Sequence, residues 1–364
     1  MVLAPDPLAD VPPGGPWPVL APPALGDGSP APAAPGTFSV VVAAYQAEAS
    51  IVDALASALD QTHPPLEVVV CDDGSTDATA ALAEGVDPRV RVLRQPNRGE
   101  SAAKNAAVAA ALGDYVVVLD ADDLFHPRRL EALAWLAARR PDLDVLTTDA
   151  VLETDGVPVR QAYHPGWPFP ADDQRAAILD HNFVFGLCAV RRERWLAAGG
   201  FDESFARAAD WEFWLRLVLD GSRVGLVDRP LARYRLTAGT LSSGRVPLVE
   251  ARLEVLRRAA ARPDLTAAER AVVRRATRRE RQDLRVRRLD QALRQGVHGT
   301  RRRALAVLLA GATPPRARAG AALATLLPGL AGRRRHDRDD GTVEIGAGLR
   351  ATPAPASGRR PPDA

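Results

Sequence analysis

The stretch YVVVLDADD, residues 115–123, decides the fold class of this chain. It begins with a continuous apolar run, which is typical of a strand buried on both faces of a parallel sheet. It ends with three carboxylates in four residues. Ligands of open parallel sheets lie beyond the carboxyl ends of the strands. The stretch therefore predicts a buried strand that leads into a ligand site.

Runs of the same kind precede this strand and alternate with helical segments. The alternation predicts an α/β domain with a Rossmann-like, mostly parallel sheet flanked by helices. The pattern loosens after residue 130, and from 246 to about 330 it predicts helix only. Strands are expected at 38–45, 66–71, 90–93, 115–119, 144–151, 184–190 and 223–227, and helices at 50–59, 76–84, 99–112, 127–139 and 209–220.

Composition limits the possible classes of protein. Of the 364 residues, 46% are hydrophobic and 25% are charged, which are ordinary globular values. The net charge of +2 gives no argument for a nucleic-acid partner, and the arginine-rich segment 267–303 lacks aromatic residues that could stack on bases. Cys71 and Cys188 form no CxxC pair. The sequence therefore predicts no zinc site and no disulfide framework.

Four parts are expected along the chain. Residues 1–36 are interpreted as a disordered leader rich in Pro and Ala, without the basic start and apolar run of a signal peptide. Residues 37–245 form the α/β domain, 246–331 an all-helical extension, and 332–364 a disordered tail. No stretch reaches the roughly 18 apolar residues that span a bilayer. Cys71 and Cys188 are interpreted as reduced thiols, so the expected location is the cytoplasm.

Two short apolar segments end the helical extension, one on each side of TPPRAR (313–318). Because arginines flank them, residues 303–330 could lie peripherally on the inner face of the plasma membrane, where lipid-linked acceptors would be met. The favoured alternative is a helical hairpin that packs on the α/β domain, or a dimer contact.

The segment DDGSTD, residues 72–77, follows the second strand. A carboxylate here can accept hydrogen bonds from a base or a ribose, and Gly74 permits the sharp turn. The alternative is a structural turn in which Ser75 or Asp77 caps the next helix. The two interpretations are compatible, with Asp77 as the cap and Asp73 as the ligand.

The crowded carboxylates Asp120, Asp122 and Asp123 repel one another and need a compensating charge. A divalent cation would supply it. Hard oxygen ligands with few protein contacts suit Mg²⁺ or Mn²⁺ that is shared with phosphates. The alternative is a solvated loop that caps the helix at 127–139.

Two helix starts are also candidate sites. NRGESAAKN (97–105) opens a helix, and Arg98 or Lys104 would add positive charge where helix N-termini bind anions. The alternative is a surface helix with basic residues. Asp210 begins the apolar helix at 209–220, where a carboxylate is more often a cap than a base. The aromatic residues of that helix are more often core than a platform for a sugar.

Taken in order and at these spacings, five segments resemble the family 2 inverting glycosyltransferases of the GT-A fold. The resemblance implies a metal-dependent enzyme that moves one sugar from a nucleotide diphosphate sugar, most often a UDP-sugar, to a hydroxyl of a glycan or lipid-linked acceptor. The segments are SVVVAAYQ (39–46), EVVVCDDGSTDAT (67–79), NRGESAAKNAAVAAALGDYVVVLDADD (97–123), GGFDESFARAADWEFWLRL (199–217) and RPLARYRLTAGTLS (229–242).

For the donor, the resemblance implies four contacts. Ala43 and Tyr45 would meet the donor base. Asp73 would hold the base or its ribose, and Lys104 would lie near the base and the phosphates.

For the chemistry, the resemblance makes Asp120 and Asp122 the DxD motif. Asp122 would touch the metal directly, and Asp120 would touch the ribose or the metal. Asp210 matches the catalytic base, which takes the proton of the acceptor hydroxyl as that hydroxyl attacks the anomeric carbon. Attack opposite the leaving diphosphate would invert that carbon.

Three positions depart from the family pattern. Ala209 replaces the acidic residue that commonly precedes the base, Gln46 replaces the usual Asn, and Thr237 stands where many members carry His. The QxxRW pattern of processive synthases is absent, which favours transfer of single sugars.

Three other functions compete with this one. Ala209 permits a catalytically silent subunit that only binds nucleotide sugars. Nucleotidyl transfer and dehydrogenase chemistry are disfavoured, because the sequence lacks a Gly-rich, Lys-bearing loop and a GxGxxG after the first strand.

Overall fold

The computed structural model describes residues 36–154, 156–236, 245–294, 300–309, 321–322, 325, 343–345 and 349–351. The leader expected at 1–36 lies outside these residues except for Gly36. The departure at Thr237 also lies outside them.

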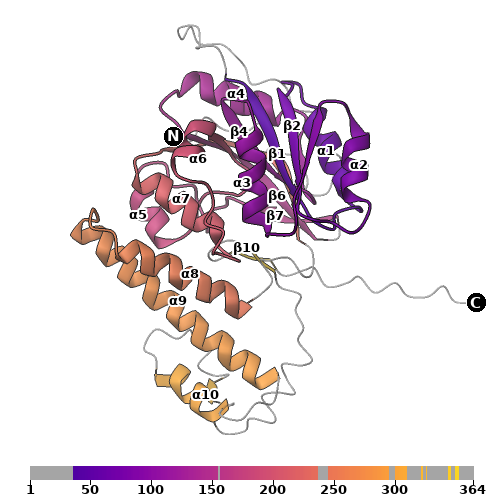
Figure 1. Ribbon diagram of the computed structural model, residues 1–364. Helices are drawn as coiled ribbons and strands as arrows, with labels where there is room; N and C mark the ends of the chain where they lie inside the picture. Colours follow the sequence, from indigo (N-terminus) through magenta and orange to yellow (C-terminus); the bar gives the residue numbers. More distant parts are fainter. Residues whose placement is uncertain are drawn as a thin grey trace, which may run out of the picture.

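One mixed sheet organises the α/β domain (Figure 1). Seven of its strands overlap predicted runs, β8 only at residues 189 and 190 of the run expected at 184–190, and the structure adds the short β5 and β7. The strands are β1 (Phe38–Ala44), β2 (Glu67–Asp72), β3 (Val90–Arg94), β4 (Tyr115–Asp120), β5 (Leu124–Phe125), β6 (Val145–Thr154), β7 (Val157–Gln161), β8 (Ala189–Arg191) and β9 (Val224–Arg235).

The sheet order is β3-β2-β1-β4-β8-β6-β9-β5, and β7 pairs with β6. The strands β1 to β4 run parallel to one another, and so do β6 and β9. Their antiparallel neighbours are β8, β5 and β7. The prediction of a mostly parallel sheet is confirmed.

Helices cover this sheet (Figure 1). Because the central strands are covered on both faces, their valines are fully buried. Two short helices, α5 and α6, were not predicted. The helices of the domain are α1 (Ile51–Leu59), α2 (Thr79–Val86), α3 (Glu100–Ala110), α4 (Arg129–Arg139), α5 (Gln174–Asp180), α6 (Arg192–Ala197) and α7 (Ala209–Leu219).

Strand register brings the polar strand ends together. Ala43 of β1 lies opposite Cys71 of β2 and Asp120 of β4. Ala44 lies opposite Asp72. Three strands therefore end at one edge of the sheet, where a ligand of a parallel sheet is expected.

The helical extension packs on the domain. In Figure 1, α8 (Arg245–Ala260) and α9 (Ala267–Arg294) lie side by side below α5 and α7. The buried side chains of Leu256 on α8 and Val273 on α9 belong to the same hydrophobic core as the sheet. The helical hairpin formed by α8 and α9 therefore packs on the domain. The alternatives stated for residues 303–330 concern a different segment, and this packing does not test them.

A second, smaller cluster joins the end of α9 to α10 (Thr300–Leu309), through Leu289, Leu293, Ala304 and Val307. Of the segment 303–330, the structure describes only 303–309, 321–322 and 325. Within the described part of the chain, none of the helices combines the length and the apolar character needed to cross a bilayer.

Within the tail at 332–364, the described residues form β10 (Val343–Ile345) and β11 (Leu349–Ala351), which pair antiparallel. The sequence predicted no regular element there, and this short hairpin is a difference from that prediction. The rest of the tail lies outside the described residues.

Candidate active site

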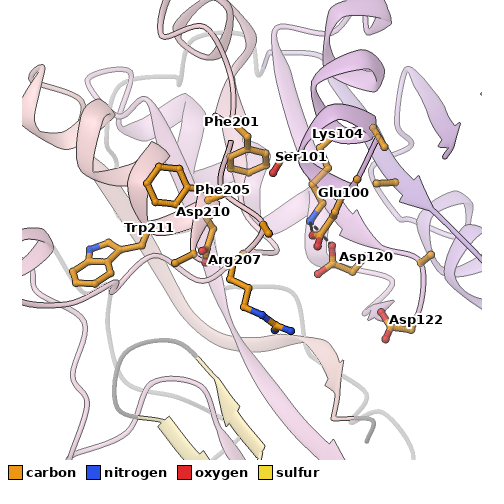
Figure 2. A pocket seen from close by; sticks show the side chains of 18 of the residues that line it. Glu100, Ser101, Lys104, Asp120, Asp122, Phe201, Phe205, Arg207, Asp210 and Trp211 are labelled. Carbon is orange, nitrogen blue, oxygen red and sulfur yellow. Dashed lines mark hydrogen bonds and ion pairs between the residues drawn. The ribbon is translucent and has the colours of Figure 1, made fainter. Parts of the chain in front are cut away.

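A cavity of about 880 Å³ opens at the carboxyl edge of the sheet. Its wall includes the ends of β1 and β4 and the starts of α3 and α7 (Figure 2). All seven residues proposed from the sequence line it: Ala43, Tyr45, Asp73, Lys104, Asp120, Asp122 and Asp210. The structure thus brings together positions that are up to 167 residues apart in the chain.

Lys104 is buried at this cavity, which excludes the alternative of a basic surface helix at this position. Its Nζ lies 2.7 Å from Oδ1 of Asp120 and 2.5 Å from Oε1 of Glu100 (Figure 2). Burial by itself lowers the pKa of Lys104. The two carboxylates outweigh that effect and hold the pKa well above its ordinary value. Lys104 is therefore a fixed positive charge beside Asp120.

The acidic loop after β4 does not cap α4. The strand β5 intervenes, and α4 has no side-chain cap at Arg128. Asp123 instead turns inward, where its Oδ1 accepts a hydrogen bond of 2.8 Å from the backbone N–H of Arg235. Its buried Oδ2 has no hydrogen-bond partner in the described part of the chain. Asp120 and Asp122 face the cavity.

Asp120 and Asp122 suit a divalent cation. Burial, and then the charge of Asp120, raise the pKa of Asp122 to about 6. No other described residue donates a hydrogen bond to the Asp122 carboxylate. The described residues contain no group of three or more His, Cys, Asp or Glu side chains placed to hold a metal. A cation here would therefore need oxygen ligands from a substrate, as expected for Mg²⁺ or Mn²⁺ held with phosphates.

Asp73 holds the segment that opens α3. Its carboxylate accepts hydrogen bonds from Gln95 Nε2 at 2.7 Å and from the backbone N–H groups of Arg98 at 2.9 Å and Gly99 at 2.8 Å. Gly99 adopts a φ of 93°, a left-handed conformation that favours glycine. A carboxylate has about four acceptor positions, so one remains for a ligand.

The N-cap residue of α2 is Ala78, without a side-chain cap, so neither Ser75 nor Asp77 occupies the predicted cap position. Asp77, one residue earlier, still makes a contact with the start of the helix. Asp77 accepts a hydrogen bond of 3.0 Å from the backbone N–H of Thr79, the first residue of α2. Ser75 does not cap the helix; its Oγ accepts from the backbone N–H of Gln46 at 3.0 Å. Gln46 also accepts from the N–H of Thr76 at 2.7 Å. The departure at Gln46 therefore ties the loop after β1 to the loop after β2.

Asp210 lies in the first turn of α7 and faces the cavity (Figure 2). Its Oδ2 accepts a hydrogen bond of 2.9 Å from Asn182 Nδ2. Burial raises the pKa of Asp210 and Glu100 adds to the rise, whereas the Trp211 backbone N–H, Lys104 and Arg252 lower it. A carboxyl group with a raised pKa is a stronger base when ionised, which suits proton abstraction.

The aromatic residues of α7 form core, as the sequence indicated. Trp211, Phe213 and Trp214 are 2%, 0% and 1% exposed. The ring of Trp195 lies 4.5 Å from that of Phe213, centroid to centroid. These contacts fix α7, and thereby Asp210, against the domain.

Other cavity residues escaped the sequence analysis. Asn182 orients Asp210, and Arg207 and Trp167 line the wall. Leu248 and Arg252 reach the cavity from α8, outside the segments that resembled the family. No local sequence pattern marks these residues, because the packing of segments distant in the chain brings them to the cavity.

The backbone is strained at the same place. Gln46 and Ala208 have φ values of 51° and 56°, and they are the only non-glycine residues with positive φ in the described part of the chain. Both line the cavity. Strain of this kind clusters at functional sites, where the surrounding structure holds it.

A mostly parallel sheet with an acidic cavity at its carboxyl edge is the arrangement expected of the GT-A fold. Solved structures show the same fold. S. aureus TarS 1–349 in complex with UDP-GlcNAc has a TM-score of 0.57 at 18% identity over 87% of this chain and 99% of that one. The mannosyltransferase PcManGT from Pyrobaculum calidifontis, in complex with GDP-Man and Mn²⁺, has a TM-score of 0.54 at 21% identity over 85% of this chain and 90% of that one.

Residues 39–196 match the family model of glycosyl transferase family 2. It is 34% identical to the chondroitin synthase of Escherichia coli over 49% of this chain and 26% of that protein. It is 29% identical to the putative teichuronic acid biosynthesis glycosyltransferase TuaG of Bacillus subtilis (strain 168) over 57% of this chain and 82% of that protein. The chain spans about a quarter or less of the chondroitin and hyaluronan synthases it matches.

Proposed function

We propose that this chain is an inverting, non-processive glycosyltransferase. It would transfer one sugar from a nucleotide diphosphate sugar to a hydroxyl of a polysaccharide, glycolipid or lipid-linked glycan precursor. One observation supports this most directly: Asp210 and the pair Asp120 and Asp122 face a single cavity. A proton acceptor and a site for a metal-bound diphosphate are the two parts that the reaction needs.

The donor side is formed by the ends of β1, β2 and β4. Ala43 and Tyr45 offer a surface for the base, and Asp73 has one acceptor position left for a base or ribose donor. Asp120 and Asp122 would hold a Mg²⁺ or Mn²⁺ ion, which when bound offsets the charge that develops on the departing diphosphate. The structure of PcManGT with GDP-Man and Mn²⁺ supports this assignment by analogy of fold.

The acceptor side is formed by α7 and α8. Asn182 holds Asp210 by one carboxylate oxygen, which leaves the other oxygen for the acceptor hydroxyl. Asp210 removes the proton of that hydroxyl during attack on the anomeric carbon. Because a single base serves one displacement, the anomeric configuration is inverted. This differs from glycoside hydrolases, which use a pair of carboxyl groups.

The relatives support a role in polysaccharide synthesis. Proteins named for chondroitin, teichuronic acid and succinoglycan synthesis are among them. UDP-sugars are the first donors to test, since TarS was solved with UDP-GlcNAc, and GDP-sugars are the second.

The test measures donor binding and donor hydrolysis together. In a thermal-shift panel of UDP-, GDP- and dTDP-sugars, one donor class should raise the melting temperature in the presence of Mn²⁺. That donor should be hydrolysed slowly. Asp210→Asn should lower the hydrolysis rate by roughly 10²- to 10⁴-fold and leave the donor-induced shift unchanged.

Three outcomes would refute parts of the proposal. If no donor raises the melting temperature in the presence of Mn²⁺, the proposed binding of a nucleotide sugar is wrong. If the wild type binds a donor but neither hydrolyses it nor transfers its sugar to any acceptor, the protein would be the silent binding subunit that Ala209 permits. Unchanged hydrolysis in Asp210→Asn would remove Asp210 from the role of base.

A further inference from the structure

Arg207 lies in the cavity wall. It is three residues before Asp210, and Figure 2 shows its guanidinium reaching from the α7 side toward the space in front of Asp120 and Asp122. Its neighbour Ala208 has a left-handed φ of 56°. Ala208, the strained residue, therefore connects Arg207 to α7, the helix that contains Asp210.

The other cations of the cavity have acidic partners. Lys104 pairs with Asp120 at 2.7 Å. Arg98 pairs with Glu203 at 2.8 Å. From α8, Arg252 lies 3.9 Å from Glu280.

Arg207 differs from all of them. Its Nη1 is buried and has no hydrogen-bond partner, and no carboxylate in the described part of the chain forms an ion pair with it. A buried donor without a partner costs free energy comparable to a lost hydrogen bond, and more when it is charged. A folded protein retains such a group at a binding cavity when a ligand provides the missing acceptor.

We infer that Arg207 binds an oxyanion of a substrate, with phosphate oxygens as the matching chemistry. A guanidinium donates two parallel hydrogen bonds to such a group. The inference rests on the proposed function, because it places the anion in the same cavity. The phosphate could come from the donor diphosphate or from a phosphorylated acceptor.

The experiment compares wild type, Arg207→Gln and Arg207→Lys by calorimetry at saturating Mn²⁺. The first arm titrates UDP and GDP, and the matching nucleosides uridine and guanosine. The second arm titrates inorganic phosphate in the presence of saturating nucleoside diphosphate. Arg223→Gln is the matched control, since it removes one positive charge at the exposed pair with Asp142, and Arg223 is not among the residues that line the cavity.

If the donor provides the phosphate, Arg207→Gln should weaken nucleoside diphosphate binding by roughly 10- to 100-fold and leave nucleoside binding unchanged. If the acceptor provides it, nucleoside diphosphate binding should stay unchanged and the added phosphate should bind more weakly by a similar factor. Arg207→Lys should recover part of either loss, because it keeps the charge without the bidentate geometry. The control should match wild type in both arms.

Two results would overturn the inference. Unchanged binding in both arms by a folded Arg207→Gln protein would show that Arg207 touches no anion. Equal losses for nucleoside and nucleoside diphosphate would show a general disturbance of the cavity. If wild type binds no nucleoside diphosphate at all, the proposed function fails, and this inference fails with it.

Discussion

At the residue scale, the carboxylates of one cavity differ in what surrounds them. Asp73 accepts three hydrogen bonds from its own chain, so it is largely a structural group. Asp120 is paired with a buried lysine. Asp210 instead accepts a hydrogen bond from the neutral amide of Asn182, and its carboxyl group is buried. Because the surroundings of a carboxyl group set its pKa and its remaining acceptor capacity, residues of one type can take different roles.

The raised pKa of Asp210 predicts the pH dependence of turnover. A base must be ionised, so kcat should fall as the pH drops through the pKa of Asp210, and this inflection should lie above the ordinary carboxyl value of 3.8. Arg252 lowers this pKa, so Arg252→Met should move the inflection to higher pH, and Arg252→Lys should restore it. Donor hydrolysis at saturating donor and Mn²⁺ measures both. An inflection that Arg252→Met leaves in place would contradict the prediction.

At the element scale, β6 contains a buried carboxyl group that the reaction does not use. The pairing of β6 with β9 is irregular on both sides of Asp149. The Oδ1 of Asp149 accepts hydrogen bonds from the N–H groups of Ala150 at 2.7 Å and Tyr163 at 3.0 Å. Its side chain therefore replaces acceptors that the interrupted ladder does not supply.

The pKa of Asp149 predicts a stabilising substitution. Burial raises this pKa from 3.8 to about 7, so the folded state loses stability as the pH rises from about 4 through 7. Asn keeps an Oδ1 for the same two N–H groups and carries no charge. Asp149→Asn should raise the free energy of unfolding at pH 8 by roughly 1–3 kcal/mol, and the gain should shrink toward pH 4.

Urea unfolding at pH 8 and pH 5 checks this prediction. The control is Asp142→Asn, which changes an exposed carboxylate whose pKa is lowered by its hydrogen bonds to Arg140. That variant should show no gain at pH 8. A loss of stability in Asp149→Asn at pH 8 would show that the charged form is the one that the fold requires.

At the scale of the whole molecule, the helical hairpin and the α/β domain share one core. Ion pairs such as Arg258 to Asp202 at 2.6 Å and Arg175 to Glu269 at 2.7 Å cross the junction. Leu248 and Arg252 of α8 also line the cavity. The extension is therefore part of the cavity wall, although the family match ends at residue 196.

A shared core predicts unfolding in one step. Leu256 on α8 is fully buried, so Leu256→Ala should cost about 2–5 kcal/mol and lower the stability of hairpin and domain together. Leu305 on α10 is 48% exposed, and Leu305→Ala should change stability little. Denaturation followed by tryptophan fluorescence and by circular dichroism should give coincident transitions for both variants. Separate transitions in Leu256→Ala would show that the hairpin folds independently.

The sequence predicted long, strongly patterned elements well and short ones poorly. The runs that became β1, β2 and β4 are continuous and apolar, and burial on both faces demands that pattern. The two-residue β5 and the six-residue α6 are too short to show a period. The aromatic side of α7 was interpreted correctly as core, because a helix with many large apolar residues must bury them.

By itself, the sequence determined the order of strands and helices along the chain and the acidic residues at the strand ends. These features are local, since each depends on residues that are neighbours in the chain. Only the tertiary structure decided that Lys104 pairs with Asp120, that Asn182 orients Asp210, and that Arg207 has no partner among the described residues. The physical reason is that such contacts depend on the packing of distant segments, which leaves no period, cap or spacing in the sequence.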